Sequence, residues 1–157
     1  MNKYPISKKG ICEVEKELHN INKIHKPKII EAIATARDHG DLKENAEYHA
    51  AKEQQAFLEG RIADLELIKE TAEVIDIQSL SSNKIIFGAT VELFEENEGK
   101  NYTYKILSPY ESDIQNGIIG INSPLARSML GKEIGHYIEF STPSKSKIFK
   151  VLSIKYI

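Results

Sequence analysis

The sequence predicts an α+β fold, in which an antiparallel two-helix coiled-coil finger precedes a small, mainly antiparallel β domain with one short helix. Apolar residues from about residue 7 to 76 recur at the three- and four-residue spacing of a helix face. Short runs rich in β-branched and aromatic residues begin at about residue 84. The predicted domains are therefore residues 1–77 and 84–157, and residues 78–83, QSLSSN, are the linker.

The two helices of the first domain meet at Gly40, a residue typical of turns. The apolar face of the first helix comprises Val14, Leu18, Ile21, Ile29, Ile30 and Ile33. The face of the second comprises Ala46, Ala50, Phe57, Leu58, Ile62, Leu65, Ile68 and Ala72. Pro27 removes a backbone donor, so it should either kink the first helix or restart it.

The length of these helices predicts a protruding hairpin. A helix of roughly 30 residues is about 45 Å long, whereas a compact chain of this size would be roughly 40 Å across. Small residues should let the two helices approach closely near the turn. They are Ala32, Ala34, Ala36, Ala46, Ala50 and Ala51.

The second domain is predicted to contain six strands: KIIF, ATVELF, YTYKIL, GIIGIN, HYIEF and IFKVLSIKYI. Residues 96–101, ENEGKN, should form a hairpin turn. A short helix is predicted with Ser123 as its N-cap, Pro124 at its first position and Gly131 as its stop.

Composition excludes several classes of protein. The net charge is −2 without a basic stripe, which argues against a phosphate-driven binder of bare DNA. The single cysteine, Cys12, excludes an intrachain disulfide and fits a reducing cytoplasm. We expect no signal peptide and no membrane contact, because no segment reaches the roughly 18 apolar residues of a membrane span.

Two carboxylates at the turn, Asp41 and Glu44, have two interpretations. Oxygen ligands suit Mg²⁺, and two acids would form half of a metal site that a partner completes around a phosphate. Alternatively, an aspartate followed three residues later by a glutamate is a capping-box-like helix start. Spacing alone favours the cap, and a cap can also position acids.

Other polar residues near the turn are weaker candidates. Arg37 and Lys52 could guide an RNA phosphate toward the acids, although ordinary helix-surface charge is the simpler interpretation. His39 and His49 could bind a metal but are more often plain solvated residues.

The second domain offers one candidate docking patch. Residues Ser123, Pro124 and Leu125 could bind a partner, with a helix cap that closes the small domain as the default interpretation.

Three long motifs resemble the GreA/GreB family of bacterial transcript cleavage factors. The N-terminal motif is KPKIIEAIATARDHGDLKENAEYHAAKEQQAFLEGRIADLE, and the C-terminal motifs are IIFGATVEL and INSPLARSMLGKEIG. The similarity runs from about residue 7 to 156. Arg37, Asp41 and Glu44 match the family pattern, whereas Lys52 stands where a basic residue, often arginine, is usual. Residues 100–115 are less typical.

This resemblance implies a coiled-coil finger and an FKBP-like C-terminal domain that docks on RNA polymerase. The finger would enter the secondary channel, where Asp41 and Glu44 help hold catalytic Mg²⁺ and a water. The polymerase would then cut its own backtracked RNA. The partners implied are RNA polymerase, the 3′ end of the nascent RNA and DNA of the elongation complex. We expect a cytoplasmic monomer with no cofactor of its own.

The leading hypothesis is therefore an accessory factor and not an enzyme. A second hypothesis is a channel-blocking regulator that does not stimulate cleavage, against which the intact Asp41 and Glu44 argue. A third is an autonomous peptidyl-prolyl isomerase, suggested only by the FKBP-like fold; the absence of tryptophan and the few clustered aromatic residues argue against it.

Overall fold

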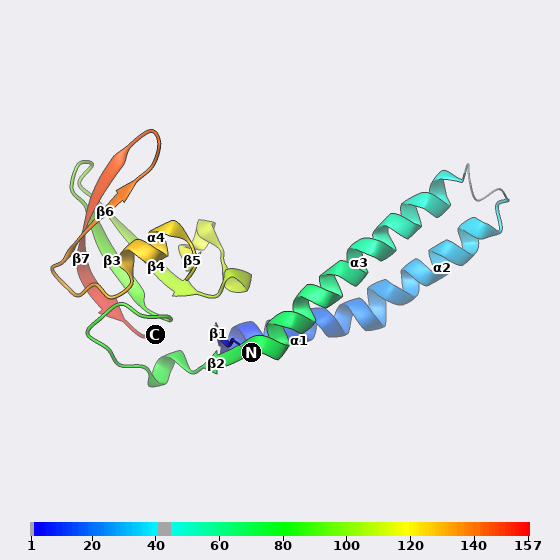
Figure 1. Cartoon of the computed structure of the whole chain (residues 1–157), viewed down its shortest axis with the longest axis horizontal. Helices are drawn as coiled ribbons and strands as arrows, with labels where there is room; N and C mark the ends of the chain where they lie inside the picture. Colours follow the sequence, from blue (N-terminus) through cyan, green and yellow to red (C-terminus); the bar gives the residue numbers. More distant parts are fainter. Residues whose placement is uncertain (1, 41–44) are drawn as a thin grey trace. The chain divides into compact units, whose positions relative to one another are not determined.

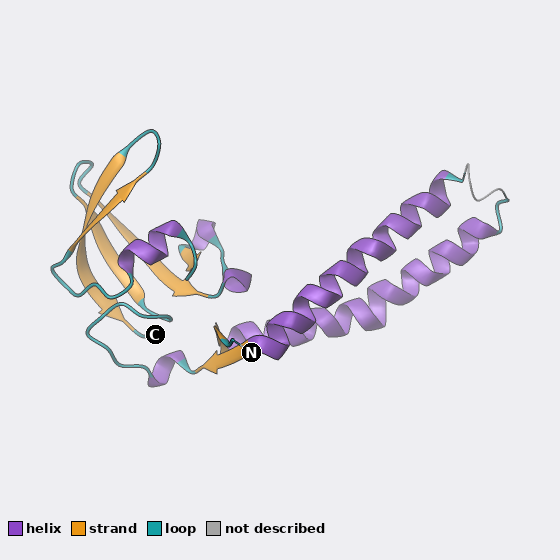
Figure 2. Ribbon diagram, viewed as in Figure 1, coloured by secondary structure: helices purple, strands orange, loops and turns teal. Residues whose placement is uncertain are grey.

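A computed structural model describes residues 2–40 and 45–157 of the chain and confirms the predicted α+β fold. The chain divides into two compact units, one formed mainly by Ile11–Ala72 and the other by Lys3–Gly10 with Glu73–Ile157. Figure 2 shows that helices build the first unit and that strands with short helices build the second. The domain limits proposed from the sequence stay a prediction.

The first arm of the hairpin is helical through three consecutive segments. These are α1 (Lys8–Asn20), a π-helical turn at Ile21–His25, and α2 (Lys26–Arg37). The amide of Lys26 donates to the carbonyl of Ile21, five residues back, which is the π-helical pattern. Pro27 then lies in the first turn of α2, where its missing donor costs least. Pro27 therefore follows a widened turn within an arm whose backbone stays helical at His25 and Lys26.

The second arm, α3 (Ala46–Thr71), lies beside α2 (Figure 1). The buried hydrophobic residues of the two arms are Val14, Leu18, Ile21, Ile33, Ala36, Ala51, Ile62 and Leu65. The predicted α3 face is wrong near its start, because Phe57 is 73% exposed and Ala50 is exposed while Ala51 is buried. Consecutive residues point about 100° apart, so Phe57 and Leu58 cannot share one seam.

Ion pairs join the arms of the hairpin along their length. Arg61 of α3 donates from Nε and Nη2 to the two carboxylate oxygens of Glu17 in α1, at 2.7 and 3.1 Å. Lys26 and Glu59 approach to 3.3 Å. The two-pronged Arg61 contact is the more specific of the two, since its geometry admits one alignment of the helices.

The helix α3 ends five residues earlier than predicted. Residues Ala72–Ile75 form strand β2, which pairs with β1 (Tyr4–Ser7) in a two-stranded sheet. The helical spacing continues through this segment, but the strand pairing depends on a partner near the N-terminus. Local spacing could not reveal that partner.

The second unit contains a five-stranded sheet in the order β5-β4-β3-β7-β6. Its strands are β3 (Thr90–Glu95), β4 (Lys100–Leu107), β5 (Ile118–Gly120), β6 (Tyr137–Ser141) and β7 (Ser146–Lys155). All pairs are antiparallel except β4 with β5. Three 3₁₀ turns, Ile77–Ser79, Pro109–Glu111 and Ile114–Asn116, lie between strands. The turn predicted at residues 96–101 joins β3 to β4.

One of the six predicted strands is wrong. The segment KIIF makes only an isolated bridge, Lys84 with Glu133. Its fully buried Ile85 instead exchanges backbone hydrogen bonds with Gly131 and Lys132, at 2.8 Å each. An apolar run in which the buried Ile85 and Phe87 flank the exposed Ile86 therefore pairs with a loop, and periodicity cannot distinguish this arrangement from a strand.

The short helix α4 (Pro124–Met129) closes the core of this unit. Ser123 Oγ accepts from the amide of Ala126 at 3.3 Å, as expected for an N-cap. Gly131 has φ +82°, which confirms the predicted glycine stop. Ala126 and Met129 are fully buried in the hydrophobic core cluster, which also contains Val91 of β3. Across the described parts of the chain, no helix combines the length and apolarity that a membrane crossing requires.

Candidate functional site at the hairpin end

The candidate site is the end of the hairpin, where α2 leads toward α3. Asp38 still has helical backbone angles, and Gly40 has φ +117°, a conformation that favours glycine. The predicted metal ligands and caps, Asp41 and Glu44, lie outside the described residues. The described part of the site comprises the residues on either side of this segment, 36–40 and 45–52.

The N-cap of α3 is Asn45, and the prediction that Asp41 caps this helix is wrong. Asn45 has extended backbone angles, and its Oδ1 accepts from the amide of Tyr48 at 3.1 Å. Asparagine and aspartate cap helices equally well, so residue preference did not discriminate between them. The helix start at Ala46 decides the matter, because a cap must lie directly before it.

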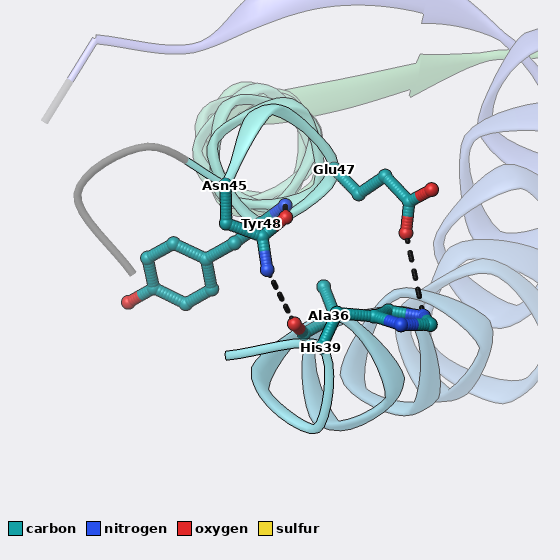
Figure 3. A network of polar contacts seen from close by, with 5 residues as sticks. All are labelled: Ala36, His39, Asn45, Glu47 and Tyr48. Carbon is teal, nitrogen blue, oxygen red and sulfur yellow. Dashed lines mark hydrogen bonds and ion pairs between the residues drawn. The ribbon is translucent and has the colours of Figure 1, made fainter. Parts of the chain in front are cut away.

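The same side chain also reaches the other helix. Asn45 Nδ2 donates to the carbonyl of Ala36 at 2.5 Å (Figure 3). Ala36 lies in the last turn of α2, and its carbonyl also accepts from the His39 amide at 3.2 Å. The Asn45 amide group therefore adds a second donor to a carbonyl of α2 and supplies the acceptor for an amide in the first turn of α3.

Two exposed contacts flank this bond. The guanidinium carbon of Arg37 lies 5.8 Å from the centroid of the Tyr48 ring, within the range of a cation–π interaction. His39 Nε2 lies 3.6 Å from Glu47 Oε2, and Figure 3 shows both side chains reaching across from their helices. These three contacts join the described flanks of the hairpin end.

The two candidate phosphate-binding residues lie on opposite helices and are both exposed. Arg37 rests against Tyr48, while Lys52 Nζ donates to Gln55 Oε1 at 3.0 Å. The ring of the candidate ligand His49 lies edge-on to that of Tyr48, 5.6 Å away. Among the residues that the structure describes, no three His, Cys, Asp or Glu side chains gather as a metal site would require.

The candidate docking residues of α4 have different environments. Ser123 is half-buried and caps the helix, and Leu125 packs against the core cluster. Pro124 is exposed. The structure confirms the default interpretation, since Ser123 caps the helix and Leu125 helps to close the core of the small domain. The docking role of Ser123, Pro124 and Leu125 stays a prediction.

Sequence reasoning missed Asn45 and Tyr48 as organising residues. Their signal was present, since an asparagine three residues before a helical amide is a normal N-cap. The nearby pair of Asp41 and Glu44 matches a capping pattern as well. No local rule decides between this pair and Asn45 as the start of the helix. The bond to Ala36 O gave no signal, because it joins residues of different helices.

Two family models together match most of the chain. The model for "Transcription elongation factor, N-terminal" matches residues 4–74, and the model for "Transcription elongation factor, GreA/GreB, C-term" matches residues 80–156. The chain is 44% identical to transcription elongation factor GreA of Alkalilimnicola ehrlichii, over 99% of both proteins. It is 45% identical to that of Thioalkalivibrio sulfidiphilus, over the full length of both.

Solved structures also align with the chain. GreA factor homolog 1 of Thermus thermophilus aligns with a TM-score of 0.46 and 22% identity, covering 98% of this chain and 99% of that one. A GreA/GreB elongation factor from Nitrosomonas europaea aligns with a TM-score of 0.44 and 16% identity, covering 99% and 100%.

Proposed function

The chain belongs to the GreA/GreB family of transcription elongation factors, and we propose that it binds RNA polymerase and stimulates cleavage of backtracked RNA by the polymerase. The coiled-coil hairpin enters the secondary channel and presents Asp41 and Glu44 at the catalytic centre. Cleavage then frees an arrested complex to resume elongation.

The observation that carries this proposal is the construction of the hairpin end. Helix α3 has 26 residues, which corresponds to about 39 Å at about 1.5 Å per residue. Both acids belong to the short segment between Gly40 and Asn45, and cross-helix contacts hold the flanks of this segment. A long, narrow and internally braced support suits chemistry at a recessed centre.

The acids fit a shared Mg²⁺ ion by their chemistry. Mg²⁺ binds oxygen ligands and is commonly held by one or two carboxylates with phosphate oxygens completing its shell. When bound, the ion would lower the pKa of a water and stabilise charge on the phosphate. Asp41 and Glu44 would hold and orient the ion and its water, while the polymerase supplies the remaining ligands.

The exposed cations below the acids suit contact with RNA. Arg37 and Lys52 come from opposite helices, so a phosphate chain could pass between them. Lysine contributes charge without the two-pronged phosphate contact of arginine, so Arg37 is the more directional of the two. The nascent RNA 3′ end is the proposed ligand, with the DNA of the elongation complex as a further neighbour.

Residues 84–157, which follow the predicted finger (residues 1–77) and the predicted linker (residues 78–83), are proposed to dock on the polymerase as an FKBP-like domain. Within the proposed patch of Ser123, Pro124 and Leu125, the exposed Pro124 is best placed for direct contact. The protein would act as a cytoplasmic monomer, since one hairpin occupies one channel. It would assist the polymerase's own endonuclease activity and would not be an enzyme by itself.

The proposal is tested on backtracked elongation complexes with Mg²⁺, by following release of short 3′ RNA fragments. Wild type should accelerate cleavage. Asp41→Asn and Glu44→Gln remove charge at constant shape and should lower the stimulated rate roughly 10²-fold or more, the loss typical of an electrostatic catalytic group. Asp38→Asn, the same change on an exposed neighbour, should have little effect.

Two outcomes would contradict the proposal. If wild type bound the polymerase without accelerating cleavage, the protein would be a channel-blocking regulator. If both acid variants cleaved like wild type, the tip-acid mechanism would be wrong. Prolyl isomerisation by the full chain, measured on a peptide substrate, would support the third hypothesis instead.

A further inference from the structure

The feature that carries a further inference is the double hydrogen bond of Asn45. Its Nδ2 donates to the Ala36 carbonyl at 2.5 Å and its Oδ1 accepts from the Tyr48 amide at 3.1 Å (Figure 3). The side-chain amide of asparagine carries both a donor and an acceptor, so one residue makes both bonds. The pairing also determines the orientation of the amide.

We propose that Asn45 is a positioning residue, which sets the separation of the two helix ends that carry the segment with Asp41 and Glu44. The inference rests on the proposed function and deepens it. Only four residues separate Gly40 from Asn45 in sequence, so a change in the spacing of the helices displaces the points from which both acids are held. A displacement of about 1 Å at a catalytic group can cost about 10²-fold in rate.

The other two ties at the hairpin end are weaker constraints. His39 and Glu47 are 60% and 74% exposed, and exposed ion pairs contribute little. The stacking of Arg37 on Tyr48 holds no fixed distance between backbones, because the arginine side chain is long and flexible. Asn45 is half-buried and bonds directly to backbone atoms of both helices.

The two bonds of Asn45 can be separated by one substitution. Asn45→Asp keeps an oxygen for the Tyr48 amide, and aspartate is an equally good N-cap. It loses the donor to Ala36 and places a carboxylate opposite a carbonyl oxygen, which repels it. Asn45→Ala removes both bonds. A helix-capping role predicts damage only in Asn45→Ala, whereas a positioning role predicts damage in both variants.

The experiment measures the cleavage rate of backtracked polymerase complexes as a function of factor concentration. For Asn45→Asp we expect the maximal rate to fall about 10- to 100-fold, while the half-saturating concentration stays within about twofold of wild type. Hydrogen exchange of the Tyr48 amide should stay as slow as in wild type, because its acceptor remains. Asn20→Asp, which adds the same charge on an exposed position of α1, should behave like wild type in all three measurements.

Each alternative result has a definite meaning. If wild type accelerates cleavage and Asn45→Asp reaches the same maximal rate, the positioning role is wrong and the proposed function stands. If the rate falls together with Tyr48 protection, α3 has frayed, and the separate role of the cross-helix bond is wrong. If wild type itself does not accelerate cleavage, the proposed function fails and the inference fails with it.

Discussion

The carboxylate of Glu111 accepts hydrogen bonds from Ser7, although 104 residues separate the two in sequence. The Ser7 amide donates to Oε2 at 3.3 Å and the Ser7 hydroxyl donates to Oε1. Ser108 donates to Oε2 from its amide and its hydroxyl, at 3.2 and 2.8 Å. Ser7 Oγ also accepts from the Gly10 amide at 2.9 Å in the first turn of α1. One carboxylate thus ties the start of α1 to the turn before β5, within the second unit.

Replacing this acceptor should destabilise the second unit. Glu111→Gln converts one oxygen into a donor that faces hydroxyl and amide donors, so we expect the free energy of unfolding to fall by about 1–3 kcal/mol. Urea denaturation followed by circular dichroism measures the change. Glu96→Gln, at an exposed site of the same unit, should change stability by less than about 0.5 kcal/mol. Equal losses of unfolding free energy in the two variants would show that the hydrogen bonds of Glu111 contribute no more to stability than an exposed glutamate does.

Gly10 leaves the space that the Glu111 carboxylate occupies. A Cβ at Gly10 would lie 2.4 Å from Glu111 Cδ and Oε1, closer than atoms can approach. Gly10→Ala should therefore destabilise wild type, although alanine is favoured in helices by about 1 kcal/mol. In a Glu111→Ala background the clash is gone, so the same change should become stabilising by about 0.5–1 kcal/mol. A double-mutant cycle in urea tests this change of sign, and an unchanged sign would contradict it.

The pair of Glu17 and Arg61 should stabilise the hairpin through its geometry more than through its charge. Arg61→Lys keeps the charge but loses the planar pair of donor nitrogens that contacts both carboxylate oxygens. We expect a loss of about 0.5 kcal/mol, and a coupling energy of about 0.2–1 kcal/mol in the cycle with Glu17→Gln, because the pair is partly exposed. Thermal unfolding at low and high salt measures the stability loss of Arg61→Lys and the coupling energy with Glu17→Gln. A coupling that salt does not weaken would argue against an ionic contribution.

Tyr104 should make stability depend on pH in the alkaline range. Burial raises the pKa of its phenol above the ordinary value of 10.0, and Tyr102 raises it further while Lys147 lowers it. The folded state therefore holds the proton more tightly than the unfolded state. This contribution is fully present below about pH 10 and is lost as the pH rises above it.

The comparison of wild type with Tyr104→Phe isolates this effect. The unfolding free energy of wild type should fall more steeply above about pH 10 than that of the variant, since phenylalanine does not titrate. Urea denaturation at a series of pH values gives both curves. Parallel curves would mean that the pKa of Tyr104 is the same in the folded and unfolded states.

Local patterns located most elements and failed where a distant partner decided the outcome. The cap at Ser123 and the stop at Gly131 were predictable, because capping depends on a few neighbouring residues. Strand β2 was read as helix because its partner β1 lies at the other end of the hairpin sequence. The apolar spacing predicts Phe57 on the seam, whereas the phase of the packed helices leaves it exposed.

The sequence by itself determined the α+β class, the hairpin, the family and the location of Asp41 and Glu44 in the turn segment, because these follow from periodicity, composition and long motifs. Only the tertiary structure decided that a π-helical turn precedes Pro27, that Asn45 caps α3, and that Glu111 bonds to Ser7. Each of these depends on how backbone donors and acceptors are satisfied. The Glu111 bonds to Ser7 join residues that are 104 positions apart, and the Asn45 bond to Ala36 joins two different helices, so both arise only when the helices and strands pack.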